Sequence, residues 1–138
     1  MTYFIKTTEK DLKELVDDFL FTGGGGSAHI EQVLGGALQG QGFGFDFYGL
    51  FFKGDDWDTE TESYYFPTPI DNKHALIETN AYVDDQVNDS EIGYIPLEML
   101  YNSFANVVEI KSKDSNTTQD IPKLEKMLAE LKKKWQIK

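Results

Sequence analysis

The chain of 138 residues contains no cysteine and no arginine. Without cysteine, disulfides, thiolate metal sites and cysteine nucleophiles are excluded together, and the composition fits a reducing cytoplasm. Without arginine, the chain lacks the fork-shaped donor that phosphate and guanine recognition favours, so we expect no nucleic-acid binding. No run of about 18 apolar residues is present, and we expect no membrane span. These absences predict a cytoplasmic protein.

Negative charge is concentrated in the middle of the chain. The formal net charge is -11, and all 13 basic residues are lysine. The stretch from Asp46 to Glu98 holds 13 acids and two lysines, whereas residues 99–138 hold more lysines than acids. The length is that of one ordinary domain, so we expect a single binding domain over residues 1–138.

Four segments have the apolar spacing of helices. The first runs from Thr8 to Phe21 with Thr8 as its N-cap, and the second follows Ser27, a possible cap, and ends by Gly40. A third helix begins at Pro96, and a fourth is capped by Asp120 with Pro122 in its first turn. The sequence therefore predicts two N-terminal and two C-terminal helices.

The middle of the chain has aromatic and β-branched runs instead. They begin at Phe43, continue through Leu50–Lys53, Ser63–Phe66 and Ala75–Val83, and end with a possible short strand at Ile92–Ile95. Asp, Gly, Pro and Asn clusters separate these runs, as is typical of antiparallel strands. We therefore expect an α+β fold with a central antiparallel sheet of three or four strands.

Motifs of catalysis and metal binding do not match the chain. The glycines at 23–26 lack the lysine and preceding strand of a phosphate loop, and no serine lies in a GxSxG elbow. His29 and His74 lie far apart with no metal-ligand spacing. Asp56, Asp58 and Glu60 alternate as in a calcium loop, but Thr61 replaces the turn glycine and Pro67 the final glutamate. We expect no catalytic residues, no cofactor and no metal, so the chain is not expected to be an enzyme.

One acidic segment also carries aromatic side chains, and this mixture favours protein binding over a solvated loop. Aromatic anchors supply affinity, and a concentrated field raises the association rate with a basic protein. The expected partner-binding residues are Asp55, Asp56, Trp57, Asp58, Glu60, Glu62, Tyr64 and Tyr65, with Asp84 and Asp85 as a second edge.

Several motifs between Gly40 and Phe104 resemble bacterial immunity proteins of contact-dependent growth inhibition (CDI), in the branch that neutralises ribonuclease toxins. They are GQGFGF at 40–45, LFF at 50–52, DDWD at 55–58, YYF at 64–66 and IPLEMLY at 95–101. The resemblance implies a small cytoplasmic protein that binds the toxin domain of a neighbouring cell, one to one, and blocks its RNA-binding cleft. This agrees with the charge argument, since a ribonuclease is basic around its active site.

Two other interpretations remain open. The chain can be a non-enzymatic adaptor domain that docks a basic segment of another cellular protein, or a calcium-responsive module. The position of the gene relative to a toxin gene distinguishes an immunity protein from an adaptor.

Overall fold

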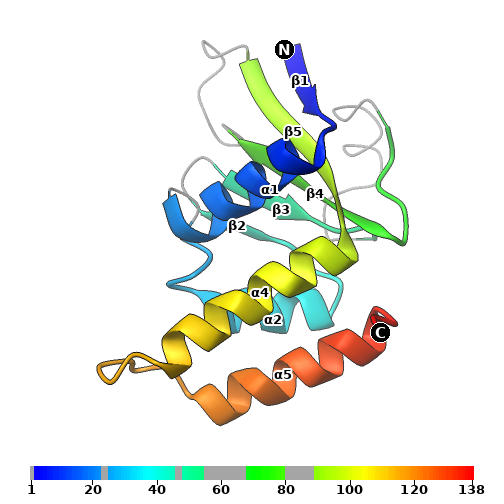
Figure 1. Ribbon diagram of the computed structural model, residues 1–138. Helices are drawn as coiled ribbons and strands as arrows, with labels where there is room; N and C mark the ends of the chain where they lie inside the picture. The colour runs from blue at the N-terminus through cyan, green and yellow to red at the C-terminus, as the bar shows by residue number, and fades with distance from the viewer. Residues whose placement is uncertain (1, 23–24, 46–47, 55–67, 80–88) are drawn as a thin grey trace.

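The computed structural model describes residues 2–22, 25–45, 48–54, 68–79 and 89–138 (Figure 1). These residues form an α+β fold with four α-helices, a π-helical turn and a five-stranded mixed sheet. The elements follow the chain as β1 (Thr2–Lys6), α1 (Glu9–Asp17), the π-helical turn η1 (Asp18–Thr22), α2 (Ile30–Leu38), β2 (Phe43–Phe45), β3 (Tyr48–Phe51), β4 (His74–Thr79), β5 (Asp89–Pro96), α4 (Leu97–Ser112) and α5 (Ile121–Lys134).

The strands lie in the order β1-β5-β4-β3-β2. Strands β2 to β5 are joined by antiparallel pairings, so the middle of the chain forms a meander. Strand β1 pairs in parallel with β5, from Thr2 opposite Asp89 to Lys6 opposite Gly93. The N-terminal residues therefore form one edge of the sheet and β2 forms the other.

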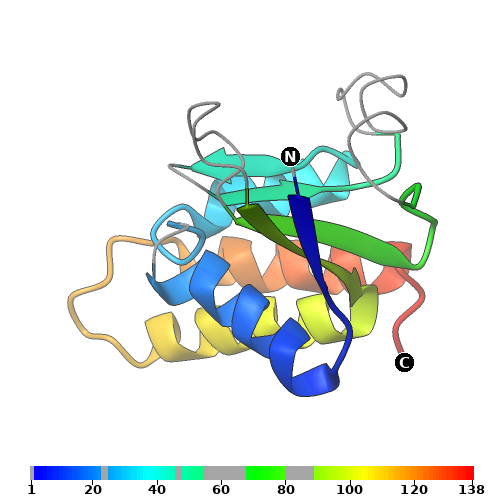
Figure 2. The same cartoon turned by 90° about the horizontal axis from the view of Figure 1, so that it is seen from above.

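One main core lies between the helices and one face of the sheet. Figure 2 shows α1 and α4 side by side on the same side of the strands. Fully buried side chains of this core include Val16 of α1, Leu34 of α2, Ile77 of β4, Phe104 of α4 and Leu124 of α5. Because each helix buries one apolar stripe in this core, the periodic pattern of each helix specifies its packed face.

Helix α1 approaches the sheet closely at Gly93 of β5. A Cβ atom at this position would lie 2.7 Å from the side chains of both Leu12 and Leu15. The absence of a side chain therefore lets α1 pack directly on β5. This contact places the start of α1 next to the start of α4.

The helix starts agree with the sequence at three of four positions. The Thr8 hydroxyl accepts a hydrogen bond from the Asp11 N–H at 3.1 Å, and the Asp120 carboxylate accepts one from Lys123 N–H at 3.1 Å. Pro96 lies directly before α4. Proline suits the start of a helix because the backbone N–H that it lacks would have no acceptor there. The Ser27 cap was wrong, because α2 begins after His29 without a side-chain cap.

The predicted α+β class is confirmed, but the predicted sheet differs from the observed one. Strands are found in the expected regions at β2, β3, β4 and β5, but the parallel strand β1 was not expected. The predicted strand at 63–66 and the end of the one at 75–83 lie outside the described residues. The sheet is therefore mixed and five-stranded, not purely antiparallel with three or four strands. No helix among the described residues is long and apolar enough to cross a membrane.

A smaller apolar cluster lies on the other face of the sheet. It consists of Phe51, Ile70, Leu76 and Ile92, with Tyr94 packed against it. The Tyr94 hydroxyl accepts a hydrogen bond from the Thr68 N–H at 3.1 Å and donates one to its carbonyl oxygen. Glu78 alternates with Ile77 along β4, so its side chain lies on this face.

Candidate partner-binding surface

The ten predicted binding residues all lie outside the described part of the chain. Asp55 to Tyr65 fall between β3 and β4, and Asp84 and Asp85 fall between β4 and β5. Strand β4 begins at His74 and ends at Thr79, which are roughly 17 Å apart at the rise of a β-strand. The two predicted sets therefore connect to opposite ends of β4, here called the His74 end and the Thr79 end.

Four side chains from four strands lie in a row at the Thr79 end. Phe4 of β1 is opposite Glu91 of β5, and Tyr48 of β3 is opposite Thr79 of β4. Residues that pair directly across strands point to the same face, which here is the helix-covered one. We call Phe4, Glu91, Thr79 and Tyr48 the Thr79-end row.

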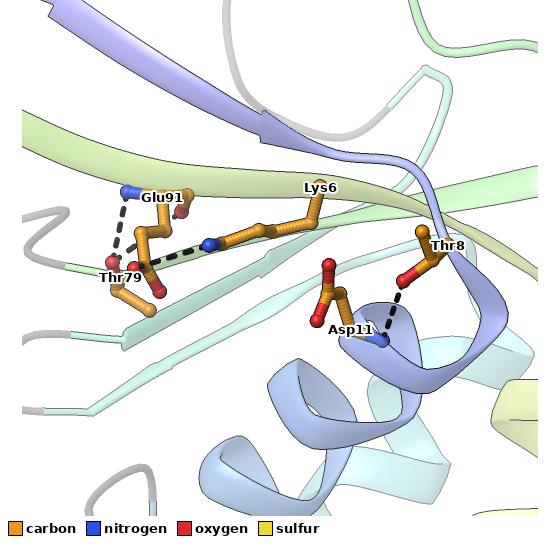
Figure 3. A network of polar contacts seen from close by, with 5 residues as sticks. All are labelled: Lys6, Thr8, Asp11, Thr79 and Glu91. Atoms are coloured by element: carbon orange, nitrogen blue, oxygen red, sulfur yellow. Dashed lines mark hydrogen bonds and ion pairs between the residues drawn. The ribbon is translucent and has the colours of Figure 1, made fainter.

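Hydrogen bonds join two members of this row, Thr79 and Glu91, and an ion pair joins Glu91 to Lys6 (Figure 3). The Glu91 N–H donates to the Thr79 hydroxyl at 3.0 Å, and this hydroxyl donates to the Glu91 carbonyl oxygen at 3.4 Å. The Lys6 ammonium lies 3.5 Å from the Glu91 carboxylate. The side chain of Thr79 thus extends the pairing of β4 and β5 beyond the last backbone pair, Glu78 with Ile92.

Negative charge converges on Tyr48 at the end of the row. Burial raises the pKa of the Tyr48 phenol, and the nearby carboxylates of Asp18 and Glu91 raise this pKa further. The phenol therefore keeps its proton and can donate a hydrogen bond at neutral pH. Asp18 comes from η1, where α1 widens into a π-helical turn, so the helix end supplies the second acid.

The row combines an exposed aromatic side chain with an exposed acid. Phe4 is 51% exposed, and the side chain of Glu91 is 48% exposed. Aromatic rings and carboxylates together can bind a lysine or arginine side chain of a partner. Among the described residues, no group of three or more His, Asp or Glu side chains could hold a metal ion.

Sequence reasoning missed the Thr79-end row because its members come from four separate segments. The signal for β1 was present, since Thr2–Lys6 contains an aromatic pair and an isoleucine typical of a strand. No local pattern indicates that Phe4 lies beside Glu91. Only the parallel pairing of β1 with β5 brings these two residues together.

No protein-family model matches the chain. A search of curated proteins and a search of solved structures likewise give no match.

Proposed function

We propose that the protein is a non-enzymatic binding protein that neutralises a basic toxin domain as a cytoplasmic immunity protein, of the kind found in contact-dependent growth inhibition. The toxin is a ribonuclease in this proposal, and the complex is one to one. The single observation that carries the proposal is the charge distribution, with 13 acids and two lysines between Asp46 and Glu98. A partner that normally binds RNA presents the complementary charge.

The Thr79-end row supports this proposal from the described residues. It provides an exposed phenyl ring, an exposed carboxylate and a phenol donor at the end of the sheet to which residues 80–88 connect. Exposed acids raise the association rate through long-range attraction, whereas buried aromatic anchors slow dissociation. Binding of the toxin would therefore use both kinds of side chain.

The direct test uses the reading frame immediately upstream of the gene. Its C-terminal domain is produced with and without this protein, and cell growth, RNA cleavage and complex formation are measured. The proposal predicts that the protein restores growth, inhibits cleavage and binds at equimolar ratio. Absence of inhibition together with binding to a basic segment of another cellular protein would favour the adaptor interpretation instead.

Two groups of variants test the surface within that complex. Replacing Asp55, Asp56 and Asp58 by Asn should mainly slow association and weaken its salt dependence. Trp57→Ala should mainly speed dissociation, with a loss on the order of 2 kcal/mol if the indole fills a desolvated pocket of the partner.

Phe4→Ala combined with Glu91→Gln tests the Thr79-end row. Ile110→Ala combined with Glu109→Gln is a matched control, because Ile110 is equally exposed and Glu109 lies beside it near the end of α4. Thermal melts of each variant distinguish a lost contact from a lost fold. The assignment of this surface is wrong if folded variants of the row bind the toxin as tightly as the parent.

A further inference from the structure

An open groove lies between the first turns of α1 and α4, at the His74 end of the sheet. Its volume is about 1090 Å³, slightly above the usual range of about 300–1,000 Å³ for sites that bind small molecules. The side chains that matter for its chemistry are Glu9, Lys10 and Leu12 from α1 and Glu98, Met99, Asn102, Ser103 and Asn106 from α4. The groove and the Thr79-end row lie at opposite ends of β4, so the two sites are distinct.

Ser103 lines the groove with a hydroxyl that the fold does not use. Its side chain is only 3% exposed, and its Oγ has no hydrogen-bond partner within the described part of the chain. A buried polar group without a partner costs about 1–3 kcal/mol. Ser103 lies one turn after Met99 on α4, and both residues line the groove. The groove is where a ligand atom could satisfy the Ser103 hydroxyl.

The start of α4 adds two further donors on the same side. Pro96 offers no side-chain cap, and the Leu97 N–H is already bonded to the Lys73 carbonyl oxygen at 3.0 Å. The N–H groups of Glu98 and Met99 lie in the first turn of α4, where a helix offers no acceptor of its own. Thr8 and Asp120 cap α1 and α5, whereas α2, like α4, begins without a side-chain cap.

The local charge is more favourable to an anion than the net charge of the chain implies. Helices α1 and α4 both begin at the groove, and the positive ends of their dipoles add there. Lys10 has no ion-pair partner in the described residues, whereas Lys13 is bonded to Asp17 at 2.7 Å. Glu9 and Glu98, both exposed, oppose an anion and would limit its affinity.

We propose that this groove binds the C-terminal carboxylate of a peptide. The N–H groups of Glu98 and Met99 and the Lys10 ammonium receive the carboxylate, and Ser103 bonds the preceding part of the chain. Asn102 and Asn106 lie one turn apart along α4, where their amides can pair with an extended backbone. A groove that follows α4 for two turns fits a chain better than a lone ion.

The first experiment compares a matched pair of peptides. An acetylated trialanine with a free C-terminal carboxylate and the same peptide as its amide are titrated into the ¹⁵N-labelled protein. The carboxylate form should shift the backbone amide signals of Glu98 and Met99 in a saturable way, and the amide form should not. Inorganic phosphate serves as a separate arm. The proposal fails if the amide form binds equally well, if phosphate binds as tightly as the peptide acid, or if neither signal moves.

Variants that remove one charge show whether the bound group is negatively or positively charged. Lys10→Gln should weaken binding of the peptide acid roughly two- to fivefold, and Glu98→Gln should strengthen it by a similar factor, since each changes one exposed charge. Lys133→Gln and Glu125→Gln, on exposed positions of α5, are matched controls that should change neither. The reverse pattern, in which Lys10→Gln strengthens binding and Glu98→Gln weakens it, would overturn the assignment, because it would indicate a cationic ligand.

Ser103→Ala separates a binding role from a structural role. If the hydroxyl is reserved for a ligand, the variant should weaken peptide binding roughly two- to tenfold and at the same time raise the melting temperature. A purely structural hydroxyl would give a lower melting temperature and unchanged binding, which would contradict the proposal. Should Ser103→Ala fail to fold, it would also count against the proposal, and the charge variants remain as an independent test.

Discussion

Two hydroxyl groups, one at each end of the sheet, differ in whether the fold gives them a hydrogen-bond partner. At the Thr79 end, the Thr79 hydroxyl and the Glu91 carboxylate find partners within the fold. At the His74 end, the Ser103 hydroxyl is buried without a hydrogen-bond partner among the described residues, and α4 begins without a side-chain cap. A polar group that the fold satisfies stabilises the fold, whereas one left without a partner costs free energy until a ligand arrives. The Thr79 hydroxyl therefore stabilises the fold, whereas the Ser103 hydroxyl is left for a ligand to bind.

The largest effect is expected from a substitution in the main core, which supports both ends of the sheet. Phe104 is fully buried on α4, and its ring lies 6.3 Å from that of Trp135. Phe104→Ala should lower the free energy of unfolding by about 3–5 kcal/mol, because it leaves a cavity between the helices and the sheet. Chemical denaturation measures this loss, and binding at both ends should fall together.

Ile110→Ala is the control for this change on the same helix. Ile110 is 51% exposed, so its truncation should change stability by no more than about 0.5 kcal/mol. Equal effects of the two substitutions would show that the helices and the sheet do not share one core.

The next largest effect is the pH dependence of stability that the buried Glu78, next to Thr79 on β4, produces. Glu78 is only 6% exposed, and burial raises its pKa from 4.5 to about 7. The folded protein therefore holds this proton more tightly than the unfolded chain does. The contribution of Glu78 is most favourable below about pH 4.5 and is lost as the pH rises through about 7.

Glu78→Gln isolates this pH dependence. At pH 8 the variant should be more stable than the parent by up to about 3 kcal/mol, and at pH 4.5 the two should differ little. Urea denaturation at several pH values measures the difference between the two proteins, in which the other carboxylates cancel. Parallel stability curves for parent and variant would refute the raised pKa.

The smallest effect compares the loss of one hydroxyl at each end. Thr79→Val removes two hydrogen bonds to the Glu91 backbone and should cost about 0.5–1.5 kcal/mol. Ser103→Ala removes a hydroxyl that has no partner in the described part of the chain and should stabilise the fold by about 1 kcal/mol. Thermal and urea melts of both variants give the two signs. Equal signs would remove the distinction between the two ends.

Local signals in the sequence were sufficient for the helices. Thr8 and Asp120 were recognisable as caps because a short polar side chain precedes an apolar periodic run at each position. Ser27 has the same signal but did not cap α2. Its N–H instead donates to the Leu20 carbonyl oxygen at 2.8 Å, so the chain turns after η1 before α2 starts at Ile30. Tertiary contacts of the preceding turn overrode the local preference.

The sequence by itself determined the charge distribution, the α+β class, the four helices and the approximate places of β2 to β5, because composition and short-range periodicity encode them. Only the tertiary structure decided that β1 pairs in parallel with β5, that Phe4 lies beside Glu91, and that Ser103 is buried at a groove. Each of these depends on contacts between segments far apart in the chain. The free energy of such contacts comes from the packing of whole elements, which no local pattern of residues specifies.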